Sequence, residues 1–318
     1  IKFLIIIMIR YIYLLIFLSP LLSQEEIAPT LHGEELFDYI QDNYTTTSVQ
    51  SYDSARDILY GEIDNINGYV YCIYTDFSVQ LNGSDPSVNL YENGMNCEHL
   101  WPQSQYVGDS PMKSDMHTLR PCKSNVNSSR GNNPYNEIND FLTLTWFWLD
   151  YASNIIPANN INEYSESSST AFEPREEVKG DVARAMFYFY TIYEDIADDD
   201  FFNIQKEALY QWHIQDPIEE SEVSRTWAIA SYQNNIPNPF ILDDTLIYRA
   251  YFYDGNNDNM GDVTQDGTVN VVDVVLIINY IIGIQILNNT QLQIADINAD
   301  GIINIVDIVA LINIIIGD

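Results

Sequence analysis

An acidic residue stands directly beside a histidine in the segment MNCEHLWPQS, residues 95–104. Glu98 supplies a carboxylate that can hold a cation, and a neutral imidazole at His99 can take a proton near pH 7. Neighbouring side chains of a regular strand point to opposite faces, so both residues can serve one site only at a strand end or a bulge. Taken alone, such a pair more often marks an ordinary surface contact, because two-residue motifs arise easily by chance.

A second set of metal-ligand residues lies near the carboxyl end, where residues 262–273 and 296–307 repeat one pattern with glycine at the sixth position. Oxygen ligands at positions 1, 3, 5, 9 and 12, with a backbone carbonyl at position 7, are what a seven-coordinate calcium ion requires. We therefore predict two calcium loops, with a merely acidic loop as the alternative. The predicted ligands are Asp262, Thr264, Asp266, Thr268, Asn270, Asp273, Asp296, Asn298, Asp300, Ile302, Asn304 and Asp307.

The formal net charge of -33 argues against a chain that coats nucleic acid, because its average field repels phosphates. The basic residues are unevenly distributed, however. A cluster follows the acid–histidine pair, and Asp115 is its acidic exception. Such a patch on an acidic body can still hold a polyanion, with a sharper salt dependence. Its members are Lys113, Arg120, Lys123 and Arg130.

Residues 1–23 combine basic residues, an apolar run and then small polar residues, which is typical of a secretory signal peptide. A membrane anchor is the competing interpretation, since the apolar tract approaches the roughly 20 residues that span a bilayer. In an oxidising compartment, a Cys97–Cys122 bridge and small buried thiols are both compatible with the three cysteines, of which Cys72 is the third.

Hydrophobic periodicity and turn residues predict the elements that surround the acid–histidine pair. We expect two helices within residues 31–60, a strand at 69–74, a second short strand ending at Pro102, a buried stretch at 141–151, an exposed polar loop at 159–170, helices at 173–193 and 218–234, and a linker at 254–259.

Three blocks of sequence resemble the bacterial endonuclease I family and its extracellular ribonuclease relatives. The patterns E-H-x-x-P-x-S, D-x-H-x-L-x-P and V-N-x-x-R-x-N occur in order, at residues 98–104, 115–121 and 126–132. With further similar segments downstream, the resemblance covers residues 31–252. It implies an α+β fold with a ββα-metal (His-Me finger) nuclease domain and surrounding helices.

The resemblance also implies roles for individual residues. Glu98 and Asn127 would hold one magnesium or manganese ion, and His99 would be the general base. Arg130 and Arg120 are the predicted phosphate-clamping residues, because the loop in which endonuclease I places an arginine is short and lacks a basic residue here. The predicted substrate contacts are Lys113, Lys123, Asn132 and Trp101, with core packing favoured over substrate stacking for Trp101.

The substrate preference is left open by one departure from the family pattern. Asn96 stands where endonuclease I carries a further acid, and this shorter form is closer to the extracellular ribonucleases. We expect His117 to be a hydrogen-bonded scaffold residue, and Asp115 either to orient His117 or a backbone amide or to contact metal.

The repeated loops resemble those of dockerin modules, in which each loop is joined to one helix. This resemblance covers residues 261–317 and implies a small all-α domain with two Ca²⁺ ions and a cohesin-like or cell-surface protein partner. The tenth and eleventh loop positions are Val271 and Val272 in one copy, and Ile305 and Val306 in the other, in place of the hydroxyl pair of familiar cellulosomal dockerins.

We thus expect a signal peptide at 1–23, a catalytic domain at 24–254, a linker at 255–260 and a dockerin-like domain at 261–318. The expected activity is a secreted, metal-dependent, sequence-nonspecific endonuclease that hydrolyses DNA and also RNA. An extracellular ribonuclease, or an inactive, calcium-dependent scaffold-binding surface protein, are the alternatives.

Overall fold

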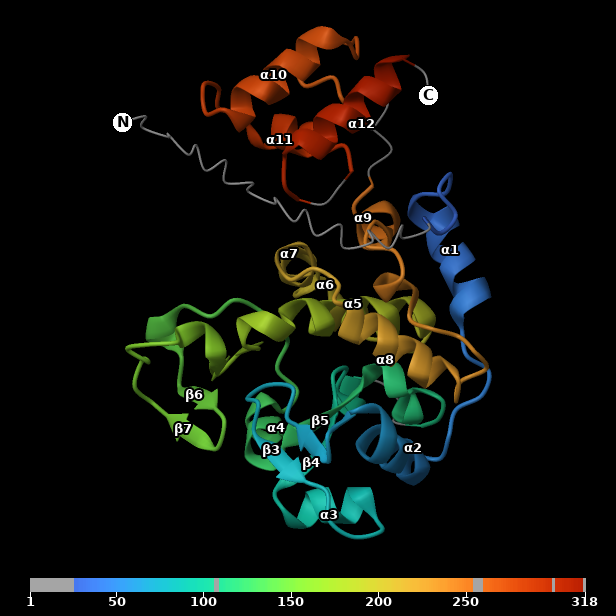
Figure 1. Ribbon diagram of the computed structural model, residues 1–318, viewed down its shortest axis with the longest axis vertical. Helices are drawn as coiled ribbons and strands as arrows, with labels where there is room; N and C mark the ends of the chain where they lie inside the picture. Colours follow the sequence, from blue (N-terminus) through green and yellow to red (C-terminus); the bar gives the residue numbers. More distant parts are fainter. Residues whose placement is uncertain (1–25, 106–108, 254–259, 299–300, 317–318) are drawn as a thin grey trace, which may run out of the picture.

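A computed structural model describes residues 26–105, 109–253, 260–298 and 301–316 (Figure 1). The predicted signal peptide, the predicted linker except residue 260, and the predicted calcium ligand Asp300 lie outside these residues. Within the described part, none of the helices is both long and apolar enough to cross a bilayer.

The strands of the described sheets pair antiparallel, and a long run of helices follows the last strand, as is typical of an α+β fold. The helices are α1 (Gly33–Tyr44), α2 (Tyr52–Ile58), α3 (Pro86–Glu92), α4 (Ser124–Arg130), α5 (Lys179–Ile192), α6 (Asp199–Asn203), α7 (Lys206–Gln215), α8 (Glu220–Ala230), α9 (Leu246–Tyr251), α10 (Val271–Ile281), α11 (Asn289–Ala295) and α12 (Ile305–Ile316). The strands are β1 (Asn65–Ile66), β2 (Tyr69–Tyr71), β3 (Ser78–Gln80), β4 (Met95–His99), β5 (Leu119–Lys123), β6 (Thr145–Trp148), β7 (Tyr151–Ser153), β8 (Ser165–Ser167) and β9 (Phe172–Glu173).

The acid–histidine pair lies on a ββα unit. Strand β4 pairs antiparallel with β5, with Glu98 opposite Arg120 and His99 opposite Leu119. Helix α4 follows β5 directly and packs its buried Val126 inward. Gly131 ends this helix at φ +56°, a conformation that favours glycine. The strand we predicted to run to Pro102 therefore ends at His99, which places the imidazole at a strand terminus.

Helix α5 is the buried centre of the larger domain. Its predicted amphipathic face is instead an almost wholly buried helix, because α1, α7 and the ββα unit surround it. In Figure 1, α5 runs across the middle of this domain, above β4, β5 and α4. The helix begins at Lys179, later than predicted, because Phe172 and Glu173 form strand β9 before it.

The four-stranded sheet corrects our expectations for the middle of the chain. Sheet order β7-β6-β8-β9 takes strand β8 from the segment that we predicted to be an exposed polar loop, and all of β8 is buried. Conversely, the predicted buried stretch at 141–151 begins exposed, with Phe141 87% exposed, and becomes buried only at Trp146 and Phe147. Alternation on a sheet edge, rather than total apolarity, decides which of these side chains reach the core.

The three cysteines are free thiols. Cys122 lies opposite Asn96, whereas Cys97 lies opposite Pro121, so Cys97 and Cys122 project to opposite faces of the β4–β5 ribbon. The Cys97–Cys122 bridge is therefore absent. Cys72 is instead the neighbour of Cys122, at an Sγ–Sγ distance of 3.9 Å.

The carboxyl-terminal helices form their own core, as a small all-α domain should. Helices α10 and α12 each follow one predicted calcium loop and pack together, and their buried residues include Val274, Ile277, Ile308 and Leu311. Helix α11 lies between them in the sequence and was not predicted. In Figure 1 the three helices group at the top of the view, beyond α7 and α9.

Candidate nuclease site and calcium loops

The pleat of β4 sends Glu98 and His99 to opposite sides of the strand. The His99 ring stacks on Tyr52 of α2, with ring centroids 5.3 Å apart. Glu98 faces α4, where its Oε1 lies 3.5 Å from Nε of Arg130. His99 is the last residue of β4, so the pair lies at a strand end, where neighbouring side chains can serve one site.

The hydrogen bonds of His99 fix which ring nitrogen can accept a proton. Nε2 lies 3.0 Å from the carbonyl oxygen of Lys113, which can only accept, so Nε2 carries the hydrogen. Nδ1 then presents a lone pair, and the exposed Gln103 amide donates to it at 3.0 Å. Burial, helped by the positive charges of Lys113, Arg130 and Arg56, lowers the pKa of His99 to about 4. The imidazole is therefore neutral at pH 7, as a general base must be.

Glu98 is buried, at 2% exposure, among groups that prefer its charged form. The Tyr74 hydroxyl donates to Oε1 at 2.9 Å, and Tyr74 in turn lies 2.6 Å from the Tyr135 hydroxyl. Burial raises the pKa of Glu98 to about 7, while Arg130 and the Tyr74 bond oppose that rise. Among the described residues no donor reaches Oε2, so this oxygen is available as a ligand.

Asn127 is held so that its amide oxygen is also available. Its Nδ2 donates to Asn96 Oδ1 at 2.9 Å and to the Cys97 carbonyl at 3.1 Å. Since a carbonyl only accepts, this bond fixes the amide with Oδ1 turned away. Asn127 thus lies beside the Asn96 side chain, which projects from the same face of β4 as Glu98. A carboxylate oxygen and an amide oxygen are the hard ligands that magnesium prefers, so the pair fits such an ion.

The two predicted phosphate clamps are buried inside the domain. Arg130 is 1% exposed, and its Nη2 donates to the Leu100 carbonyl at 2.6 Å. Arg120 is also buried and pairs with Asp181 of α5 at 3.2 Å. In this structure Arg130 lies beside Glu98, and Arg120 joins the ββα unit to α5. Their role as phosphate clamps stays a prediction.

The predicted substrate contacts divide in a similar way. Trp101 is buried and stacks on Phe189 of α5 at 4.8 Å, which corrects its prediction in favour of core packing. Asn132 is exposed just beyond α4. The ammonium of Lys123 pairs with Asp150. Lys113 is partly exposed and adjoins His99 through its carbonyl oxygen.

Asp115 and His117 belong to the scaffold beneath the site. The buried Asp115 carboxylate accepts from the hydroxyls of Tyr188 and Tyr193 at 2.9 and 2.6 Å, and from the His117 backbone N–H at 3.0 Å. His117 Nε2 donates to the Ile236 carbonyl at 3.0 Å. Both carboxylate oxygens of Asp115 therefore accept structural hydrogen bonds, and those from Tyr188 and Tyr193 join the loop before β5 to α5 and its C-terminal end.

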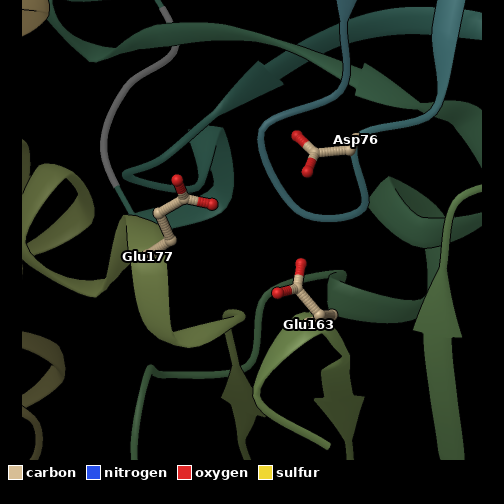
Figure 2. A group of neighbouring side chains, drawn as sticks. All are labelled: Asp76, Glu163 and Glu177. Carbon is tan, nitrogen blue, oxygen red and sulfur yellow. The ribbon is translucent and has the colours of Figure 1, made fainter. Parts of the chain in front are cut away.

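A separate group of carboxylates lies outside the ββα unit. Ligand oxygens of Asp76, Glu163 and Glu177 all lie within 4.8 Å of one another and face a common space (Figure 2). Arg175 pairs with Asp76 at 2.9 Å and with Glu177 at 2.6 Å. This guanidinium already offsets much of the charge that would attract a cation.

The first calcium loop is arranged as its spacing predicts. Asp262, at position 1, accepts from the backbone N–H groups of Asp266 and Gly267 at 3.0 and 2.7 Å. Asp273, at position 12, accepts from the Thr264 hydroxyl and backbone N–H at 2.9 and 2.8 Å. The Thr264 hydroxyl also lies 3.3 Å from Asp262 Oδ1, so it links carboxylates from the two ends of the loop.

The second loop repeats this arrangement over its described residues. Asp296 accepts from the Gly301 N–H at 2.7 Å, and Asp307 accepts from the Ile297 and Asn304 N–H groups at 2.9 and 2.8 Å. Gly301, like Gly267 in the first loop, has a positive φ at the sixth position. The remaining described ligands of the two loops are Thr268, Asn270, Asn298 and Ile302, which lie at the loop surface.

Several residues at the nuclease site were missed from sequence. Gln103 could have been predicted from the sequence, because it lies in the same motif as His99. Tyr74 and Tyr135, which surround Glu98, gave no signal, since nothing in their own segments indicates that β2 and the chain after α4 meet behind β4. Tyr52 was hidden for the same reason at the start of α2.

Comparisons with known proteins agree with this geometry. The Endonuclease I family model matches residues 30–245, and the Dockerin type I domain model matches residues 260–316. The chain is 32% identical over 190 residues to the extracellular ribonuclease of Bacillus subtilis (strain 168), which covers 54% of this chain and 58% of that protein. It is 33% identical over 188 residues to the extracellular ribonuclease of Bacillus amyloliquefaciens, covering 54% and 57%.

The match therefore spans a little over half the length of each curated relative. Both resemblances found in the sequence are confirmed, since the two family models divide the chain where its composition changes. With a ββα unit that carries Glu98, His99 and Asn127, and a tail that carries two repeated loops, the chain belongs to the endonuclease I family and ends in a type I dockerin domain.

Proposed function

We propose that this protein is an extracellular, magnesium-dependent, sequence-nonspecific endonuclease that cleaves phosphodiester bonds. The observation that carries this proposal is the state of His99: a neutral imidazole at a strand end, with Nε2 committed to the Lys113 carbonyl and Nδ1 able to accept. A hydrolase needs this state to take a proton from water at neutral pH. Manganese could replace magnesium at the same oxygen ligands.

The chain's own residues divide the work. Glu98 and Asn127 would hold the cation with one oxygen each, and Asn96 keeps the Asn127 amide in the required orientation. Bound magnesium would supply charge stabilisation to the transition state. Nδ1 of His99 takes the proton from the attacking water once that water displaces the exposed Gln103 amide. Lys113 keeps the ring from rotating, because its carbonyl holds Nε2.

A ribonuclease is the second candidate. Two observations favour it: both curated relatives are named extracellular ribonucleases, and Asn96 supplies an amide where endonuclease I carries an acid. An amide at this position gives a site with less negative charge. We therefore propose cleavage of both DNA and RNA and leave their ratio to experiment.

The tail is proposed to act separately from catalysis. Two Ca²⁺ ions would complete the loops beginning at Asp262 and Asp296, whose carboxylates already gather backbone N–H groups. Dockerin membership suggests a cohesin-like or cell-surface protein as the partner. Such a tail would retain a secreted nuclease near a surface.

Digestion of plasmid DNA and of a structured RNA by the full chain tests the proposed activity directly. We expect cleavage of both with magnesium, none with a chelator of divalent ions, and restoration when magnesium is added back. Products should show no preferred sequence at their ends. If neither polymer is cleaved in excess magnesium or manganese, the chain is a non-catalytic binding protein and the proposal fails.

A further inference from the structure

The positive charges nearest His99 do not come from the ββα unit alone. Arg120 and Arg130, the arginines of that unit, are buried, as described above. Arg56 lies on α2, one helical turn after Tyr52, and its guanidinium carbon lies 4.7 Å from the centre of the Tyr52 ring. The Lys113 ammonium lies 5.2 Å from the centre of the same ring. Tyr52 itself stacks on His99, so two cations flank the ring that covers the general base.

Both cations lie beside the ring that stacks on the imidazole, and the carbonyl oxygen of Lys113 lies 3.0 Å from Nε2 of His99. An anion placed between these cations would therefore lie within electrostatic range of His99.

The guanidinium of Arg56 is free to change partners. It pairs with Asp53 at 2.5 Å, but the Asp53 side chain is 83% exposed and the Arg56 side chain is 28% exposed. Exposed ion pairs on a helix contribute little, typically about 0.3 to 0.5 kcal/mol. Nε of Arg56 is buried and has no hydrogen-bond partner among the described residues. A phosphate could therefore replace Asp53 at little cost.

We propose that Arg56, with Lys113 beside it, binds a backbone phosphate of the substrate strand next to His99. This inference rests on the proposed nuclease function and assigns Arg56 a substrate contact in addition to those predicted for Arg120 and Arg130. Tyr52 holds the two cations at the edge of the site, and Asp53 occupies Arg56 until a phosphate arrives.

Salt-dependent binding separates this role from a structural one. A fluorescently labelled single-stranded RNA would be titrated against the full-length His99→Ala chain in magnesium, at several salt concentrations, with and without Arg56→Gln. Loss of one phosphate contact should weaken affinity several-fold and reduce the slope of log K against log salt by about 0.7 to 1. Arg56→Lys, which keeps the charge, should restore most of the slope.

Matched variants control for general charge effects. Lys206→Gln on α7 removes a cation that lies over Phe252, far from α2 in Figure 1, and should leave the slope unchanged. Asp53→Asn should tighten RNA binding more than Asp195→Asn does. Both substitutions remove one exposed negative charge, but only Asp53 pairs with Arg56. Circular dichroism of each variant would verify folding.

The result that overturns the proposal is a slope for Arg56→Gln equal to that for Lys206→Gln, in folded protein that still binds RNA. This failure is distinguishable from failure of the proposed function. If the His99→Ala chain still cleaves nucleic acid, the general base is misassigned, whereas the salt slope tests Arg56 alone.

Discussion

The proposed nuclease site and the predicted calcium loops are built in opposite ways. Each loop takes its ligands from one short segment, gathers them with backbone N–H groups and leaves several of them exposed, as Asp266 and Thr268 are. The nuclease site takes Glu98 from a strand and Asn127 from a helix, and buries the carboxylate against Tyr74 and Arg130. From this contrast we propose that the loops need an ion for their own structure, whereas the nuclease site needs one for chemistry.

This difference has a physical origin. Repelling carboxylates in a small module are neutralised by the ion, so binding contributes directly to folding. At the nuclease site Arg130 already neutralises Glu98, and a large hydrophobic core supports both strands. An ion there is needed for chemistry and contributes little to the fold. The four predictions below test this contrast.

The largest expected effect is on catalysis. Replacing His99 by alanine should lower kcat about 10²- to 10⁴-fold, because only the proton acceptor is lost. The far-ultraviolet circular dichroism should change little, while the melting temperature should fall modestly because the stacking on Tyr52 and the bond to the Lys113 carbonyl are lost. His32→Ala is the matched control, since His32 stacks on Tyr253 away from the ββα unit, and it should retain full activity. Near-normal cleavage by His99→Ala would remove the basis for a general base at this position.

Removing calcium should unfold the tail but leave the nuclease domain intact. A chelator that prefers calcium over magnesium should abolish the helical signal of α10 and α12, because their loop carboxylates then repel one another. The magnesium-dependent activity should persist. Circular dichroism and cleavage assays on the same sample would test the contrast, and full helix content in excess chelator would contradict it.

Replacing Asn127 by alanine should raise the magnesium concentration needed for half-maximal activity by roughly 10- to 100-fold, as expected when a metal site loses an orienting or ligating group. The melting temperature should fall only slightly. Ser128→Ala, which alters the neighbouring exposed position of α4, is the control. An unchanged magnesium requirement for Asn127→Ala would show that the amide is no ligand.

The last prediction is a difference in acid sensitivity between the domains. All four histidines precede residue 214, so the tail has none. Burial lowers the pKa of His213 to about 4, below its unfolded value of about 6.5. The unfolded state therefore binds more protons between these values, and His213 contributes stability at neutral pH that is lost as the pH falls from 6.5 to 4.

His213→Gln should remove this contribution. The unfolding free energy of the wild type, relative to that of the variant, should fall by about 1.4 kcal/mol per pH unit between those values. Urea titrations at several pH values would measure it. A pH-independent difference between the two proteins would indicate that His213 is not buried in its neutral form.

Local motifs were enough to recognise both families, and long-range packing decided the surroundings of the candidate residues. Both loops were recognisable because their ligand spacing lies within a single segment. Glu98, His99 and Asn127 were recognisable because three ordered blocks surround them. The exposure of Arg120 and Arg130 could not be predicted, since burial depends on α5 and on the chain behind β4. A motif fixes residue types, and the fold decides which of them reach solvent.

The same limit explains the errors in the middle of the chain. Polar residues at 165–167 form the buried strand β8 because other segments satisfy them, as when Ser165 donates to the Tyr74 carbonyl at 2.6 Å. Apolar residues such as Phe141 remain exposed because no element covers that edge within the described part of the chain. Hydrophobicity in one segment contains no information about such distant partners.

Anomalous diffraction from manganese-soaked crystals of the full chain is the most direct test of where the catalytic ion binds. We predict a peak about 2 Å from both Glu98 Oε2 and Asn127 Oδ1, in addition to signals in the two tail loops. A manganese ion at Asp76, Glu163 and Glu177, with none between Glu98 and Asn127, would contradict the account.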